Sequence, residues 1–233
     1  MTFAIALSPF CFAQPSADEI IAKYVNFIGG ESQWKGLRSM YISGTYNYGG
    51  LKFDFVSYAL SPNLYKYIVK YNGKRFVQSF DGKNGWKIDG FSKDTTRKIL
   101  KGSAGKEMAN EADVEFLPPF INYKKRGFSV WKDGIDTVEE KICYKLKLVR
   151  NGNDTSTFSF DTTSGALLKK RARSTNTELD KSMIDIFYSN YKENDGYKVP
   201  FQWVVKTNDQ TILTILVNMI YPNLYIKKSQ FKN

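Results

Sequence analysis

A two-residue alternation of apolar and polar side chains recurs along this chain and constrains its fold more than any other feature. It is clearest in residues 51–55, 65–71 and 197–206. In the last of these segments the apolar positions are Tyr197, Val199, Phe201, Trp203 and Val205. Successive side chains of a strand point to opposite faces of the sheet. The pattern therefore predicts antiparallel strands with one apolar face and one solvated face.

Turn sequences separate the alternating segments. Asn-Tyr-Gly-Gly at 47–50, Asn-Gly at 72–73 and Asp-Gly at 81–82 are typical of tight turns. We expect consecutive hairpins up to about residue 88 and further strands from about residue 128, roughly a dozen strands in all. Aromatic residues make up 15% of the chain, which also favours strands. Without a linker or repeat, residues 14–233 are predicted to form a single, mainly β domain around a strongly curved antiparallel sheet.

Two helical segments accompany the predicted strands. Ser16 and Glu19 have the spacing of a capping box, and the Gly29-Gly30 pair ends the helix that follows. Its apolar stripe consists of Ile20, Ile21, Tyr24, Val25 and Ile28. The second segment is an insert at residues 92–122, where apolar residues are spaced for short helices: Ile99, Leu100, Met108 and Ala112. The insert is either a movable lid, with Ile99, Leu100 and Met108 as its contacts, or a permanently packed part of the core.

Residues 1–13 have the character of a signal peptide. They are mostly apolar, too few to span a bilayer as a helix, and end in the small-x-small sequence Cys11-Phe12-Ala13. No Lys or Arg precedes the apolar run, and lipidation of Cys11 is an alternative that the preceding Ser-Pro-Phe disfavours. We expect export to the periplasm and a mature chain from Gln14. Cys143 is then the remaining cysteine, predicted to be a half-buried thiol without a disulfide partner.

The residue types required by common catalytic centres are largely missing. The sequence contains no histidine, which removes Ser-His-Asp and Cys-His nucleophile activation and histidine metal ligands. Glu139 and Glu140 are adjacent on a predicted strand, so they are expected to point to opposite faces rather than act as an acid–base pair. We therefore predict no catalytic residue, no metal and no cofactor. An enzyme that uses Tyr, Lys or Glu stays open as a third interpretation.

The net charge of +11 and the pI of about 9.4 indicate an anionic partner. Lysines interleaved with tyrosines at 65–67 and basic runs at 123–126 and 168–173 could contact nucleic acid. Alternating strands in a lysine-rich protein produce the same pattern, and export separates the protein from nucleic acid. We predict an anionic membrane surface or an outer-membrane protein as a partner, no nucleic acid, and a monomeric state.

Several segments, taken in order, are similar to a known family. They lie at residues 27–30, 40–45, 80–86, 160–168, 188–191, 195–201 and 229–231. Their order and spacing resemble the outer-membrane lipoprotein-sorting (LolA/LolB-like) proteins of Bacteroidota. The resemblance implies an unclosed half-barrel of antiparallel strands with helices across its concave face, and a role in carrying lipoproteins, glycolipids or other acylated cargo through the periplasm. The fold also hosts at least one pigment-pathway enzyme, so it does not fix the function.

The alternation and the resemblance together predict an apolar hollow that holds an acyl chain. Burial of each CH₂ group of such a guest is worth about 0.8 kcal/mol. The expected lining residues come from the strongest alternating strands and are Phe53, Phe55, Tyr67, Val69, Phe201, Trp203 and Val205. The first interpretation is thus a carrier or binder of lipid or lipoprotein acyl chains. The second is an envelope or signalling module with a filled hollow, which contacts a protein partner through its basic face.

Overall fold

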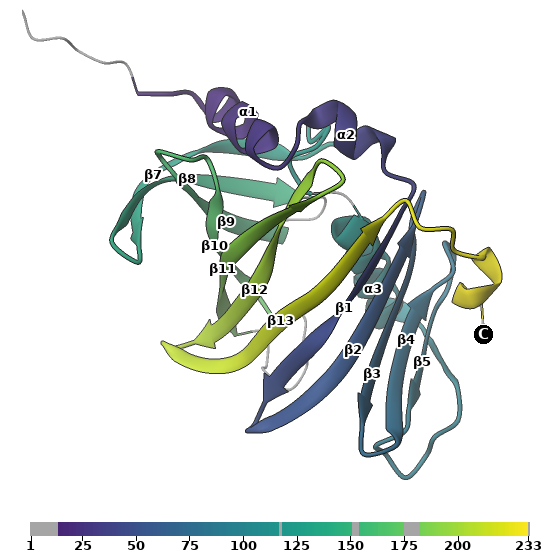
Figure 1. Cartoon of the computed structure of the whole chain (residues 1–233). Helices are drawn as coiled ribbons and strands as arrows, with labels where there is room; N and C mark the ends of the chain where they lie inside the picture. Colours follow the sequence, from purple (N-terminus) through teal and green to yellow (C-terminus); the bar gives the residue numbers. More distant parts are fainter. Residues whose placement is uncertain (1–13, 117, 151–153, 175–181, 233) are drawn as a thin grey trace, which may run out of the picture.

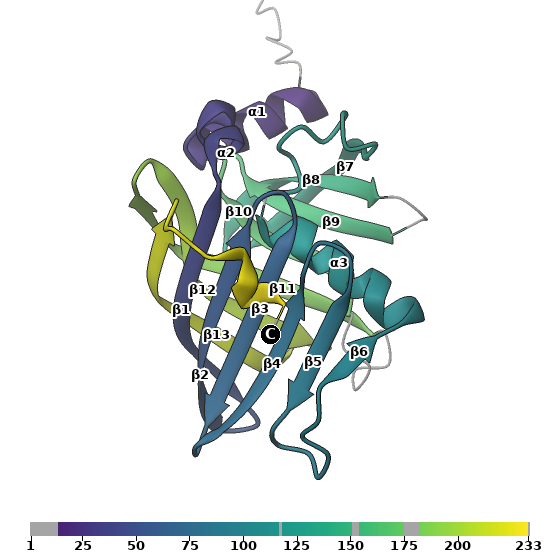
Figure 2. The same cartoon turned by 90° about the vertical axis from the view of Figure 1, so that its right-hand side faces the viewer.

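The computed structural model describes residues 14–116, 118–150, 154–174 and 182–232. They form one strongly curved sheet with helices along one end and on its inner face (Figures 1 and 2). The first strands are β1 (Ser39–Tyr48), β2 (Leu51–Leu60), β3 (Leu64–Tyr71), β4 (Lys74–Phe80), β5 (Gly85–Asp89) and β6 (Lys98–Leu100). The others are β7 (Ser129–Val138), β8 (Lys141–Arg150), β9 (Asp154–Asp161), β10 (Leu167–Arg173), β11 (Met183–Asn194), β12 (Tyr197–Thr207) and β13 (Gln210–Pro222).

The sheet is antiparallel and open. Its 13 strands follow the order β6-β5-β4-β3-β2-β1-β13-β12-β11-β10-β9-β8-β7. The chain therefore proceeds outward from β1 to β6, crosses to the opposite edge at β7, and returns by hairpins until β13 pairs with β1. β6 and β7 form the two edges of this sheet. The predicted mainly β, unclosed half-barrel is confirmed. The predicted signal peptide, residues 1–13, lies outside the described residues.

The pairing of neighbouring strands shows where the turns lie and how long they are. Asn72 and Gly73 both have positive φ and join β3 to β4 as a two-residue turn. Such turns match the twist of the paired strands but need left-handed backbone at both positions. Glu139 and Glu140 occupy the same kind of turn between β7 and β8, with φ of 46° and 66°. Their prediction as strand residues was therefore wrong, because Val138 pairs directly with Lys141.

α1 (Ala17–Phe27) begins and ends as the sequence predicts. The Ser16 side chain accepts a hydrogen bond from the Glu19 amide, and Glu19 accepts one from the Ser16 amide, which completes the capping box. Gly29 has φ +113°, and a Cβ there would lie 1.9 Å from the carbonyl oxygen of Gly196. Glycine at this position thus allows the helix end to approach the β11–β12 hairpin. α2 (Glu31–Gly36) follows at the same end of the sheet (Figure 1).

α3 (Gly102–Phe116) lies over the inner face of β2 to β5. Met108 faces these strands with 1% of its surface exposed, and its sulfur lies 2.9 Å from Nε2 of Gln78. The helical insert is shorter than predicted. Ile99 and Leu100 belong to strand β6, where they pair with Trp86 and Gly85 and extend the sheet by one strand. Backbone pairing with β5 outweighs the helical spacing of these residues.

The C-terminal segment, with the short 3₁₀ helix η2 (Lys228–Phe231), covers the opposite, outer face of the same strands (Figure 2). Trp86 Nε1 and Ser79 Oγ both donate hydrogen bonds to the carbonyl oxygen of Phe231, at 2.8 Å and 3.0 Å. The Arg97 guanidinium lies 4.5 Å from the Trp86 ring centroid. At β5 and the adjoining end of β4, the sheet is therefore covered on both faces.

Cys143 lies in β8 and is fully buried rather than half-buried as predicted. Burial, together with the nearby carboxylates of Asp161 and Asp136, raises the pKa of its thiol to about 11. It therefore behaves as a small apolar residue between β7 and β9, on the opposite side of the sheet. Among the helices of the described residues, none has the length and apolar character needed to cross a membrane.

Candidate functional site

The middle of the inner face carries rows of apolar side chains that continue from strand to strand. Trp203 on β12 pairs with Tyr188 on β11 and with Ile215 on β13. Further along β13, Ile220 pairs with Ile42 on β1. Because paired residues of neighbouring strands point to the same face, their side chains form a continuous apolar surface.

Two chambers adjoin over this surface. The first has a volume of about 240 Å³. Its walls are strands β9 to β13 and β1, and it is covered by Tyr24 and Ile28 of the α1 region, Trp34 of α2, and the Pro118-Pro119 pair that follows α3. The helices and the proline pair bridge the curved sheet without filling the space beneath them.

The second chamber has a volume of about 310 Å³ and lies between α3 and strands β1 to β4. Phe55, Ser57, Tyr67 and Gln78 line it from the sheet, and Glu111 lines it from α3. Three residues, Ile42, Trp203 and Val217, line both chambers. The chambers are therefore two parts of one elongated hollow. The second chamber lies within the usual volume range of small-molecule pockets, about 300–1,000 Å³, and the first, at about 240 Å³, lies below it.

The two chambers differ in charge. The described residues that line the first include Lys170 and Lys198 but no Asp or Glu. Its deeply placed tyrosines remain neutral, because burial raises the pKa of Tyr24 and of Tyr191. The second chamber contains the carboxylate of Glu111. The first chamber is thus apolar with positive groups in its wall.

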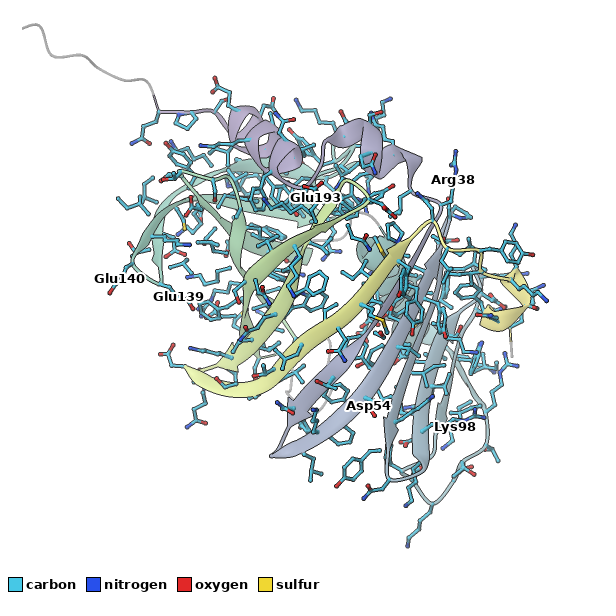
Figure 3. The ribbon with its side chains drawn as sticks, viewed as in Figure 1. Arg38, Asp54, Lys98, Glu139, Glu140 and Glu193 are labelled. Carbon is cyan, nitrogen blue, oxygen red and sulfur yellow. The ribbon has the colours of Figure 1, made fainter. Side chains whose placement is uncertain are left out.

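The described part of the chain holds no group of three or more Cys, Asp or Glu residues that could bind a metal ion. Glu139 and Glu140 lie at the turn of the β7–β8 hairpin, remote from α3 (Figure 3). The hollow instead has the features of a binding site for an apolar guest: concave walls, mostly apolar side chains and a few polar groups.

The structure places the seven predicted lining residues in two groups. Phe55, Tyr67 and Trp203 line the hollow. The other four do not line it: Val69, Phe201 and Val205 are buried, and Phe53 is half-buried. Val69 lies between Phe55 and Phe76, and Val205 between Ile186 and Leu213. The Lys192 ammonium lies over the ring of Phe201, and Phe53 stacks on Tyr46 at a centroid distance of 4.9 Å. Ligand binding by any of the seven stays a prediction.

Several lining residues were missed by the sequence analysis. Ile42 and Val217 lie on strands that were predicted, but their alternation is interrupted by a register shift at Ser43/Gly44. Trp34 and the Pro118-Pro119 pair reach the hollow only through the tertiary arrangement of the segments that cover it. Of the predicted lid contacts, Met108 is packed on the sheet, Leu100 is half-buried and Ile99 is half exposed at the sheet edge. Movement of α3 stays a prediction.

An open antiparallel half-barrel with helices across its concave face is the LolA-like fold. Comparison with solved structures confirms this fold. A DUF1329 family protein from Desulfovibrio piger matches with a TM-score of 0.61 and 12% identity, over 94% of this chain and 98% of that one. A putative outer membrane lipoprotein-sorting protein domain from Vibrio parahaemolyticus matches with a TM-score of 0.58 and 10% identity, over 91% and 94%. A LolA superfamily protein from Nitrosomonas europaea gives a TM-score of 0.59 and 8% identity, over 94% and 98%.

Sequence comparison adds no closer assignment. No family model matches the chain, and no curated protein matches it. At identities of 8–12%, the structural likeness establishes the fold alone. The predicted origin in Bacteroidota is not addressed by these three structures and stays a prediction.

Proposed function

We propose that this protein binds or carries the acyl chain of a lipid or lipoprotein in the hollow. The observation that carries the proposal is the unfilled apolar space on both sides of Trp203. A twelve-carbon chain contains about ten CH₂ groups, and their burial contributes on the order of 8 kcal/mol before the cost of association is subtracted. Such a guest matches the elongated, mostly apolar shape of the site.

Export and partners follow from the same proposal. The apolar residues 1–13 and the likeness to a putative outer membrane lipoprotein-sorting domain support a periplasmic location. A net charge of +11 supports contact with an anionic membrane surface or an outer-membrane protein. The protein acts as a non-enzymatic monomer without cofactor. The alternative, a module with a filled hollow that contacts only a protein partner, requires the two chambers to be absent and is less consistent with their volumes.

The proposal is tested by filling the hollow where its chambers join. Ile42→Trp adds a large side chain at this junction, whereas Ile142→Trp makes the same change at a side chain that is 60% exposed on β8. Binding is measured by the fluorescence of N-phenyl-1-naphthylamine, a neutral apolar probe, and by native mass spectrometry of gently purified protein. We expect probe binding and co-purified acyl compounds in the wild type and in Ile142→Trp, and at least a tenfold loss of affinity in Ile42→Trp. Equal loss in both variants, or no binding in the wild type, would contradict the proposal.

A further inference from the structure

Three consecutive basic residues on β10 have different environments. Lys169 and Arg171 face away from the hollow and form ion pairs with Asp136 at 2.7 Å and Asp185 at 3.0 Å. Lys170 points to the other face, as expected from strand alternation, and lines the first chamber. A basic side chain thus occupies an inward position on this strand.

The cross-strand partners of Lys170 are apolar. It pairs with Phe158 on β9 and with Ile186 on β11, and both of these residues also line the first chamber. Its ammonium lies 5.9 Å from the ring centroid of Phe158. In surroundings of low polarity, an ammonium attracts an anion more strongly than it does in water.

Lys198, near the start of β12, is the second basic residue in the wall of the same chamber. Its backbone amide donates a hydrogen bond to the carbonyl oxygen of Ile28, which fixes this residue against the end of α1. Its ammonium lies 4.3 Å from the ring centroid of Phe27. Glu193 pairs with Lys198 along the two strands, but it is exposed in the β11–β12 hairpin and does not line the chamber (Figure 3).

The opposite end of the hollow contains an acidic side chain. Glu111 of α3 lines the second chamber, beyond Trp203. A ligand with an anionic head would be attracted by the two lysines and repelled by this carboxylate. Its head and its chain are therefore expected to enter different chambers.

We propose that the hollow selects single-chain amphiphiles with an anionic head group, a carboxylate or a phosphate. The head lies beside Lys170 and Lys198 in the first chamber, and the acyl chain passes Trp203 into the second. This inference rests on the proposed function and deepens it, because it states the class of ligand and its direction in the hollow.

The test compares three twelve-carbon compounds that displace N-phenyl-1-naphthylamine: laurate, dodecyl phosphate and the neutral 1-dodecanol. We expect the wild type to bind at least one of the two anions about tenfold or more tightly than dodecanol, since a hydrogen bond to a charged group contributes that much. The anion that binds more tightly identifies the head group. This comparison needs no variant, so it cannot fail through misfolding.

Two double variants test whether the preference for the anionic compound depends on Lys170 and Lys198. Lys170→Gln/Lys198→Gln is expected to lose most of the preference for the anion while it keeps its affinity for dodecanol. Lys141→Gln/Lys192→Gln removes the same total charge at two exposed lysines and is expected to keep the preference. Equal loss in both double variants would attribute the preference to net charge and overturn the inference.

The outcomes separate this inference from the proposed function. If the wild type binds dodecanol and both anions with equal affinity, the head-group inference fails and the acyl-binding function stands. If the wild type binds none of the three compounds, the proposed function itself fails.

Discussion

The flank formed by β4 and β5 and the centre formed by β11, β12, β13 and β1 have the same alternating pattern, but the inner face is covered in the flank and open in the centre. In the flank, Met108 of α3 covers the inner face and Phe231 of the C-terminal segment covers the outer face. In the centre, the space above Trp203 and Ile42 stays open. The difference shows that alternation produces an apolar face, whereas a separate segment of the chain decides whether that face becomes core or cavity.

The two regions therefore have different roles in the protein. Burial of large side chains in the flank stabilises the fold, while the centre leaves apolar surface available to a guest. Substitutions in the flank should change the free energy of unfolding with little effect on binding. Substitutions in the centre should have the reverse effect.

The largest loss of stability is expected for Trp86→Ala. This side chain is 1% exposed and donates a hydrogen bond to Phe231, so its removal leaves a cavity and detaches the C-terminal segment. We expect the free energy of unfolding to fall by about 3–5 kcal/mol in urea denaturation. Trp131→Ala, at a side chain that is 43% exposed, is the matched control and should change it by less than about 1 kcal/mol. Similar values for both variants would argue against a closed flank.

A smaller loss is expected for Met108→Ala, which tests whether α3 is fixed or movable. A packed helix predicts a loss of about 2–4 kcal/mol in the free energy of unfolding. Met219→Ala, at an exposed methionine on β13, should change it by about 0.5 kcal/mol or less. An unchanged stability for Met108→Ala, accompanied by faster release of the fluorescent probe, would instead identify α3 as a lid.

The smallest change in the free energy of unfolding is expected for Cys143, which lies on β8 at the opposite side of the sheet. Its raised pKa means that the folded state keeps the proton while the unfolded thiol ionises near its ordinary value of 9.0. The stability due to this thiol is thus present below pH 9 and is lost as the pH rises towards about 11. In a Cys11→Ser background, the free energy of unfolding should decline more steeply over this range than in the same protein with Cys143→Ala. Parallel curves would show that the thiol is solvated.

The sequence was sufficient for the architecture because the relevant signals are local. The capping box at Ser16, the turn at Asn72 and the alternation of β12 each involve residues within a few positions of one another. Ile99 and Leu100 were assigned to a helix because their partner strand, β5, lies outside their local sequence. Local spacing cannot reveal such pairing.

The site was less predictable for the same reason. Phe55 and Val69 pair directly and have equally apolar positions, yet Phe55 lines the hollow and Val69 does not. Which of two such residues stays accessible depends on the size of the cross-strand neighbours and on α3. The inward direction of Lys170 could have been inferred because it lies two residues from the apolar Ala172, on the same face of β10. A run of basic residues, however, suggests a solvated face.

The most direct test uses the four tryptophans as reporters of where an acyl chain lies. Trp34 and Trp203 line the hollow, Trp86 is covered by the C-terminal segment, and Trp131 is exposed on the edge strand. A fatty acid brominated in its chain quenches the fluorescence of tryptophans that it contacts. We predict saturable quenching in the wild type and a marked reduction of that quenching in Trp203→Phe. In Trp131→Phe the quenching should be as strong as in the wild type. Quenching that persists in Trp203→Phe and disappears in Trp131→Phe, or no saturable quenching at all, would contradict an acyl-binding hollow.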